Sequence, residues 1–180
     1  MIGMASGVGK TYKMLEEGYA LQQEGIDIVI GLLETYGGKE TAEKAEGLEV
    51  IPPQLWTHGD VMLPDMNTEA VIERLPQFVL IDELAHTNVS GCLRAKPHED
   101  VEIISYAGIY VYSSMNVQHL ESLNDLVARI TGVVLRERIP DRILEATNEV
   151  ILVDITPDTL QVKITGRKNI CTPKYPRGFR

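Results

Sequence analysis

The sequence predicts an α/β fold in which helices flank a mostly parallel sheet. Short apolar runs rich in β-branched residues, such as IDIVIGLL at 26–33, alternate with segments of helical periodicity, a pattern typical of βαβ units. The 180 residues, 44% of them hydrophobic and 24% charged, are enough for one domain with a buried core. We therefore expect one globular domain over residues 1–162, followed by a tail.

The first helix is expected over residues 10–24, because an apolar stripe recurs there at helical spacing and Gly25 provides a C-terminal stop. The strand quoted above follows it. A short helix and a strand come next, at 40–45 and 48–51. Two prolines then break the pattern, so residues 54–66 are expected to be irregular, with Met62 and Met66 filling the core.

The second half of the chain continues the alternation. Asn67 or Thr68 can cap a helix that runs to Leu75, and the apolar run FVLI at 78–81 is expected to be a buried strand. The remaining elements are expected to be helix 99–106, strand 109–114, helix 120–131 and strand 149–154. From residue 163 onward there are six Lys or Arg residues and no acid, so residues 163–180 are expected to form a basic, weakly structured tail.

Residues 3–15, GMASGVGKTYKML, have the composition of a phosphate-binding loop that leads into a helix. Such a loop needs glycines so that successive backbone N–H groups point at one anion, a lysine for the β and γ phosphates, and a hydroxyl for Mg²⁺. Gly7, Gly9, Lys10 and Thr11 provide these groups in order, in a loop one residue longer than the general Walker A pattern. The alternative is a glycine-rich turn into a helix with a solvated lysine.

The run FVLIDE, residues 78–83, has the form of a buried strand that delivers carboxylates at its C-terminal edge. Asp82 is placed to hold Mg²⁺ through water, and Glu83 is placed to orient an attacking water as a catalytic residue. The alternative is a strand that ends in two exposed acids. Asn116 follows strand 109–114 and is a candidate sensor of the γ phosphate, with simple loop hydrogen bonding as the alternative.

Together these motifs predict a fold of the P-loop NTPase type with ATP and Mg²⁺ as ligands, the metal being held by Thr11 and Asp82 through the nucleotide. Only Met1 and Ile2 precede the loop, whereas a phosphate loop normally follows a buried strand, so the first strand is expected to be largely missing. The residues predicted to contact the nucleotide are Gly3, Ser6, Gly7, Val8, Gly9, Lys10, Thr11, Asp82 and Asn116.

Composition and spacing argue against several other classes of protein. The net charge of −9 is unfavourable for sequence-independent binding of nucleic acid. Cys92 and Cys171 lie far apart without metal-binding spacing, which favours reduced thiols, and no apolar run approaches the roughly 18 residues of a membrane helix. A cytoplasmic location is therefore expected. His86 and His119 follow predicted strands but match no metal motif, which favours hydrogen-bonded histidines near the ligand.

The chain also contains the stretches GVGKTYKMLEEGYALQQEGIDIVIGLLET, LIDELAHTN and SSMNVQHLESLNDLVARITGVVLRERIP. Over most of residues 3–160 they resemble the cytoplasmic N-terminal domain of the KdpD family, the osmosensitive potassium-channel sensor histidine kinases, in which the longer loop also occurs. The resemblance implies an ATP-binding sensory domain of a two-component system that controls potassium uptake. It implies as partners the other domains of an inner-membrane kinase and, through that kinase, a response regulator. Residues 36–38 and 90–94 depart from the family pattern.

The sequence leaves three functions open. The first is a nucleotide-binding input module, without a kinase core of its own, that hydrolyses ATP slowly or not at all. The second is a small P-loop ATPase or kinase in which residues 90–97 form a lid that brings Arg94 and Lys96 onto the phosphates. The third is a folded or partly folded remnant that has no ligand.

Overall fold

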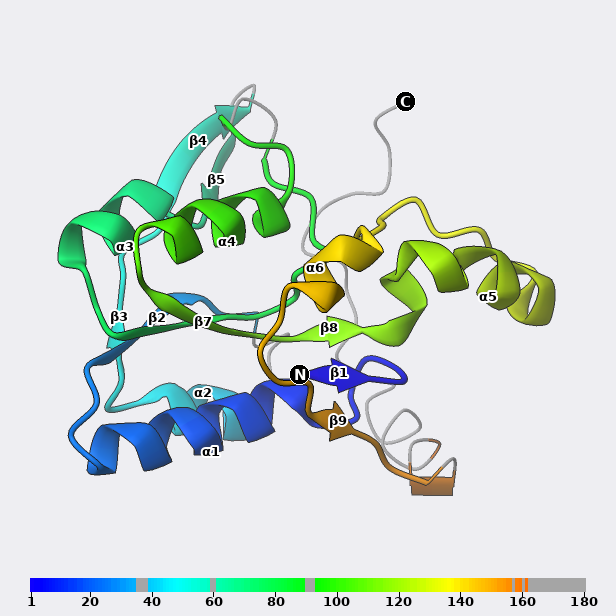
Figure 1. Cartoon of the computed structure of the whole chain (residues 1–180), viewed down its shortest axis with the longest axis horizontal. Helices are drawn as coiled ribbons and strands as arrows, with labels where there is room; N and C mark the ends of the chain where they lie inside the picture. Colours follow the sequence, from blue (N-terminus) through cyan, green and yellow to red (C-terminus); the bar gives the residue numbers. More distant parts are fainter. Residues whose placement is uncertain (35–38, 59–60, 90–92, 157, 160, 162–180) are drawn as a thin grey trace.

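The computed structural model describes residues 1–34, 39–58, 61–89, 93–156, 158–159 and 161. Parallel strands form the centre of the molecule, with α1 and α2 on one face and α3 and α4 on the other (Figure 1). The strands are β1 (Ile2–Gly3), β2 (Ile28–Leu32), β3 (Glu49–Val50), β4 (Gln54–His58), β5 (Val61–Asp65), β6 (Phe78–Ile81), β7 (Tyr110–Ser113), β8 (Met115–Asn116) and β9 (Leu152–Val153). The helices are α1 (Lys10–Gln23), α2 (Lys39–Ala45), α3 (Thr68–Arg74), α4 (Pro97–Tyr106), α5 (Asn124–Thr131) and α6 (Asp141–Glu145), with two 3₁₀ turns at Val117–His119 and Glu121–Leu123. The predicted α/β class with a mostly parallel sheet is confirmed.

Two groups of parallel strands follow one another across the fold. One has the order β3-β2-β6-β7 and the other has the order β8-β1-β9. Only Ser114 separates β7 from β8, so the chain passes directly from the first group into the second. Because all these strands are parallel, β1, β6 and β8 end at the same edge.

The strand before the phosphate-type loop is the two-residue β1. Ile2 pairs with Met115 on one side and with Leu152 on the other, so β1 is central in its group. The backbone N–H of Ile2 also donates to the carbonyl of Ile151 at 2.8 Å, and that of Met115 to the carbonyl of Met1 at 2.9 Å. The strand before the loop was expected to be largely missing, and the structure has a two-residue strand there that is paired on both sides.

Side chains alternate along the central strands and build a separate apolar cluster on each face. On the α1 side, Met14 and Leu15 pack with Ile28, Ile30 and Leu80. On the other side, Val29, Val79 and Ile81 of the same strands pack with Val71 of α3 and Ile104 of α4. The predicted helix 10–24 and strands 26–33 and 78–81 are confirmed to within three residues at their ends.

Residues 54–66 are not irregular, and this prediction was wrong. β4 and β5 form an antiparallel hairpin in which Trp56 lies opposite Leu63 and Leu55 opposite Pro64. The hairpin is a separate two-stranded sheet, where a proline is tolerated because no neighbouring strand needs its missing N–H. Met62 was expected in the core but is 58% exposed, whereas Met66 is buried as expected.

Other differences are smaller. Helix α5 begins at Asn124, after the two 3₁₀ turns, and not at residue 120. The short helix α6 was not predicted. The predicted basic tail at 163–180, Cys92 and Cys171 lie outside the described residues. None of the helices in the described ranges combines the length and the apolar character needed to cross a membrane.

Candidate functional site

The predicted nucleotide-contacting residues gather where β1, β6 and β8 end. Residues 4–9 lead from β1 into α1, Asp82 and Glu83 follow β6, and Asn116 is the last residue of β8. These segments are far apart in the sequence, and the parallel strand order brings them to one edge. The structure therefore brings the predicted residues together at this edge, including Gly3, the last residue of β1, which pairs with Asn116 of β8.

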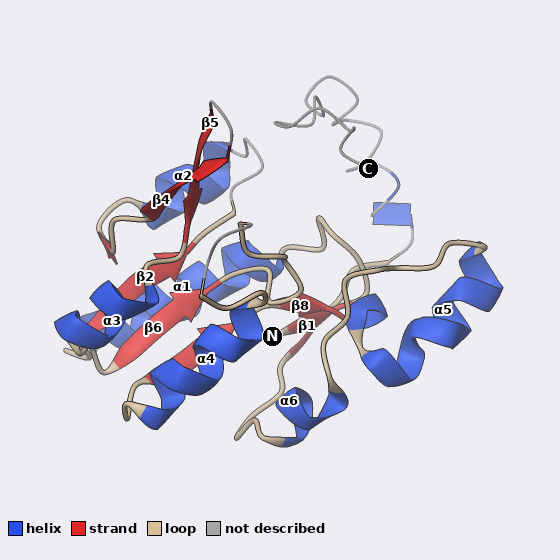
Figure 2. Cartoon of the chain, turned by 90° about the horizontal axis from the view of Figure 1, so that it is seen from above, coloured by secondary structure: helices blue, strands red, loops and turns tan. Residues whose placement is uncertain are grey.

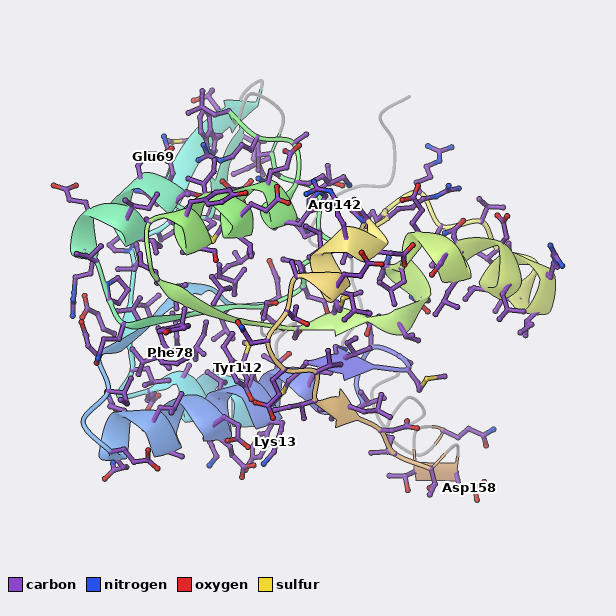
Figure 3. All side chains as sticks on the ribbon, in the orientation of Figure 1. Lys13, Glu69, Phe78, Tyr112, Arg142 and Asp158 are labelled. Atoms are coloured by element: carbon purple, nitrogen blue, oxygen red, sulfur yellow. The ribbon has the colours of Figure 1, made fainter. Side chains whose placement is uncertain are left out.

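Lys10 is the buried cation of this site. It is only 4% exposed, and its Nζ donates to Oδ1 of Asn116 at 2.6 Å and to the carbonyl of Ala5 at 3.3 Å. Burial lowers the pKa of Lys10, and the nearby carboxylates of Glu83 and Asp82 oppose that shift. Lys13, one turn further along α1, is by contrast on the outer face of the helix, where it pairs with Glu17 at 2.9 Å (Figure 3).

Asp82 is fully buried, and two hydroxyl groups from different elements bond it. Thr11 Oγ1 donates to Oδ2 at 2.8 Å, and Ser114 Oγ donates to the other carboxylate oxygen, Oδ1. Sequence reasoning missed Ser114. The sequence feature that could have indicated Ser114 is its position as a polar residue directly after β7, the neighbour of the strand β6 that leads to Asp82. The alternative of an exposed acid is wrong for Asp82.

Glu83 has an unusual backbone and an unusual electrostatic environment. Its φ of 53° lies in the left-handed region, which a non-glycine residue adopts at a cost of roughly 1 kcal/mol or more. Burial and the charge of Asp82 raise the pKa of Glu83, and Lys10 partly offsets this. A carboxyl group with a raised pKa can exchange a proton closer to neutral pH than an ordinary one.

The loop presents backbone N–H groups at the start of α1. Gly9 is the N-cap residue with φ 105°, a conformation that disfavours any side chain. The first turn of α1 contains no acidic residue, and no described side chain caps it, so its positive end is open to an anion.

Three more predicted residues hold the loop in place. Ser6 Oγ accepts from Asn116 Nδ2 at 3.3 Å, and Val8 is buried. A Cβ on Gly3 would lie 2.7 Å from Val8 Cγ2 and 2.8 Å from Lys10 Cδ. The missing side chain of Gly3 therefore leaves the space through which the lysine stem passes.

The two histidines near this edge have separate environments. His119 Nδ1 is hydrogen-bonded to the carbonyl of Glu137 at 2.9 Å, as expected of a hydrogen-bonded histidine, and the backbone N–H of His86 donates to the carbonyl of Glu83 at 2.8 Å. Within the described ranges, no group of three or more His, Cys, Asp or Glu residues is arranged to hold a metal ion.

A second polar cluster, which the sequence did not predict, surrounds Asp100 of α4. Thr68 Oγ1 and Asn88 Nδ2 donate to its two carboxylate oxygens, each at 2.7 Å. Arg94 pairs with the same carboxylate through Nε and with Glu69 of α3 at 2.8 Å. The predicted lid residue Arg94 is thus held by carboxylates of α3 and α4, and residues 90–92 of that segment lie outside the described residues.

Comparison with known proteins gives the family. The family model described as "Osmosensitive K+ channel His kinase sensor domain", KdpD, matches residues 1–175. The chain belongs to the KdpD sensor-domain family. The resemblance expected from the sequence is therefore confirmed, and the chain is a sensor domain of the kind found in potassium-related two-component sensor kinases.

Curated relatives of the KdpD family agree with this assignment. The chain is 59% identical over 167 residues to the putative sensor protein KdpD of Synechocystis sp., 47% over 163 residues to the sensor protein KdpD of Mycobacterium tuberculosis and 43% over 166 residues to that of Escherichia coli. These matches cover 93%, 91% and 92% of the chain, but only 45%, 19% and 19% of the respective relatives. In these relatives the matched segment is thus one part of a larger sensor protein.

Proposed function

We propose that this KdpD-family domain binds ATP with Mg²⁺ and acts as a nucleotide-dependent input module of a two-component sensor kinase. The observation that carries the proposal is a pair of contacts at one sheet edge, Lys10 with Asn116 and Thr11 with Asp82. They join the two halves of a Walker-type site, which are separated by 106 and 71 positions in the sequence. That juxtaposition favours a P-loop NTPase-type arrangement over a glycine-rich turn with a solvated lysine.

Each group has a role in holding MgATP. The open N–H groups of the loop and of the first turn of α1 bind phosphate oxygens, and Lys10 exchanges the amide oxygen of Asn116 for a phosphate oxygen. Thr11 and Asp82 hold Mg²⁺, directly or through water, and the metal depends on the nucleotide for further ligands.

Nucleotide binding gives the domain a regulatory output. The exchange at Lys10 releases Asn116, whose segment leads toward α5, so occupancy changes contacts beyond the site. The partners are the other domains of a membrane-bound sensor kinase and, through that kinase, its response regulator. The input module acts in the cytoplasm and participates in control of potassium uptake.

Isothermal calorimetry with MgATP tests this proposal, with two variants of α1 compared. Lys10→Ala should weaken binding by at least about tenfold, because a charge-assisted contact contributes roughly 1.5–3 kcal/mol. Lys13→Ala is the matched control, since it removes a lysine of the same helix that is 45% exposed, and it should leave affinity unchanged. Absence of MgATP binding to the wild-type chain, or equal binding by Lys10→Ala, would refute nucleotide recognition and favour a domain without this ligand.

A second candidate function is slow ATP hydrolysis or phosphoryl transfer, and the environment of Glu83 favours it. The raised pKa and the left-handed backbone of Glu83 are typical of a residue held for proton transfer. The lid postulated for this reaction would require Arg94 to leave Glu69 and Asp100. Phosphate release that Glu83→Gln abolishes, while MgATP binding persists, would support the enzyme. If no ATP hydrolysis above background is measured, the enzyme is refuted and the domain is a binding module.

A further inference from the structure

Helix α5 projects from the body of the molecule and presents apolar side chains to solvent. Two views at right angles both place it at the periphery (Figures 1 and 2). Ile130 is 76% exposed, and three other apolar residues at or just after this helix are more than half exposed, namely Leu126, Val133 and Val134. Leu126 and Ile130 are four positions apart and lie on the same face of α5, whereas Val133 and Val134 follow the C-cap residue Gly132. We call these four residues the α5 patch.

The segment that carries the α5 patch also contains three arginines. Arg129, Arg136 and Arg138 are all exposed, whereas residues 126–138 contain a single acid, Glu137. The chain as a whole carries a net charge of −9, so this basic segment differs in sign from its surroundings. Among the residues that the structure describes, none of the three arginines has an ion-pair partner.

The patch is held in its exposed position by polar contacts at its base. The backbone N–H of Ile139 donates to the carbonyl of His119 at 2.8 Å, and that of Glu121 donates to the carbonyl of Ile139 at 3.0 Å. Asn124, only 2% exposed at the start of α5, donates through Nδ2 to the carbonyl of Leu135 at 3.2 Å. These contacts join the start of α5 to the segment that returns from it, and none of them uses a side chain of the α5 patch.

We propose that the α5 patch is a docking surface for an apolar helical segment bordered by carboxylates, contributed by the remainder of the sensor kinase. Charge selects this partner, because exposed arginines around an apolar centre favour acidic groups at the rim of the interface. The chain spans only 19% of two curated relatives, so such a protein contains much further surface for contact. Two copies joined through this face about a two-fold axis would bring the same arginines together, which is unfavourable.

The test uses the 180-residue chain and two synthetic helical peptides with the same leucine stripe, one flanked by glutamate and the other by lysine, in a fluorescence anisotropy titration. The glutamate peptide should bind more tightly. The double variant Leu126→Ser, Ile130→Ser should weaken its binding by about tenfold or more, because burying each such side chain contributes roughly 1.5–3 kcal/mol. The matched control is Leu55→Ser, Met62→Ser on the β4–β5 hairpin, which changes two residues that are 54% and 58% exposed. It should leave binding unchanged.

A charge-reversal variant tests the rim separately. Arg129→Glu, Arg136→Glu should make the chain prefer the lysine peptide, with an unchanged melting temperature, because both residues are exposed. Equal binding of the two peptides by the wild-type chain would overturn the proposal, as would loss of binding in the hairpin control. A dimer in sedimentation, or binding to phosphatidylserine vesicles, that is abolished by the α5 double variant would assign the surface to a second copy or to a membrane instead. This docking proposal stands apart from nucleotide binding.

Discussion

Replacement of Asn116 by alanine examines the central contact of the candidate site. Asn116 is 2% exposed, and its Oδ1 accepts from Lys10 Nζ at 2.6 Å. The substitution leaves a buried ammonium group with the 3.3 Å contact to the Ala5 carbonyl as its other hydrogen bond. Loss of a hydrogen bond to a charged group costs roughly 2 kcal/mol of unfolding free energy. In a chain of 180 residues this corresponds to a melting temperature lower by about 4–8 °C.

MgATP should reduce this loss. If Lys10 exchanges Asn116 for a phosphate oxygen, the variant and the wild-type chain have the same partner for the ammonium group once nucleotide is bound. The thermal shift caused by saturating MgATP should therefore be larger for Asn116→Ala than for the wild-type chain. Urea unfolding with and without MgATP measures the loss of unfolding free energy, and thermal melts under the same two conditions measure the shift.

Asn124→Ala is the matched control for this measurement. Asn124 is also 2% exposed and donates a side-chain hydrogen bond, but to the carbonyl of Leu135 and away from Lys10. Its loss of stability should be the same with and without MgATP. A loss below about 0.5 kcal/mol for Asn116→Ala would refute the reasoning about the buried lysine. An equal loss with and without nucleotide would refute the exchange of partners.

Two further substitutions test other features of the site. Burial and Asp82 raise the pKa of Glu83 above its ordinary value of 4.5, so ionisation of Glu83 opposes folding at pH values above the raised pKa. Glu83→Gln should therefore be more stable than the wild-type chain at pH 8. This difference in unfolding free energy should shrink as the pH falls toward 4.5, because Glu83 of the wild-type chain then becomes protonated. A difference that does not change with pH would contradict this reasoning. Gly3→Ala should destabilise the chain by about 1–3 kcal/mol, because the added Cβ would lie 2.7 Å from Val8 Cγ2 and 2.8 Å from Lys10 Cδ. An unchanged urea midpoint would show that these two side chains move aside freely.

The central strands and α1 could be predicted from the sequence because their pattern is local. Alternating apolar residues in β2 and β6 face opposite layers, and the stripe of α1 packs against one of them. The placement of Asp82 and Asn116 at one edge follows from the same pattern, since parallel strands end together. The resemblance to the KdpD family added the identity of the domain but was not needed for the location of this edge.

The features that sequence reasoning missed depend on contacts between distant residues. Ser114 bonds Asp82 only because β7 pairs with β6 in a particular register. Arg94 was assigned to a lid, and its partners on α3 and α4 become evident only once those helices lie side by side. The β4–β5 hairpin was missed for a local reason, because Pro64 and the preceding prolines mask its alternation.

The arrangement of neutral and charged groups is the one we expect of a site that is stable by itself and that binds an anion and a metal ion as proposed. Asp82 and Lys10 are buried charges, and buried charges destabilise a fold unless they are hydrogen-bonded. Their partners are neutral groups, the hydroxyls of Thr11 and Ser114 and the amide of Asn116. A hydrogen bond between a charged group and a neutral partner stabilises the fold only modestly. A phosphate or Mg²⁺ carries a full charge, so its bonds to Lys10 or Asp82 would be stronger, and replacing the neutral partner would lower the free energy. Direct ion pairs between Lys10 and Asp82 would satisfy the fold equally well, but they would compete with both ligands.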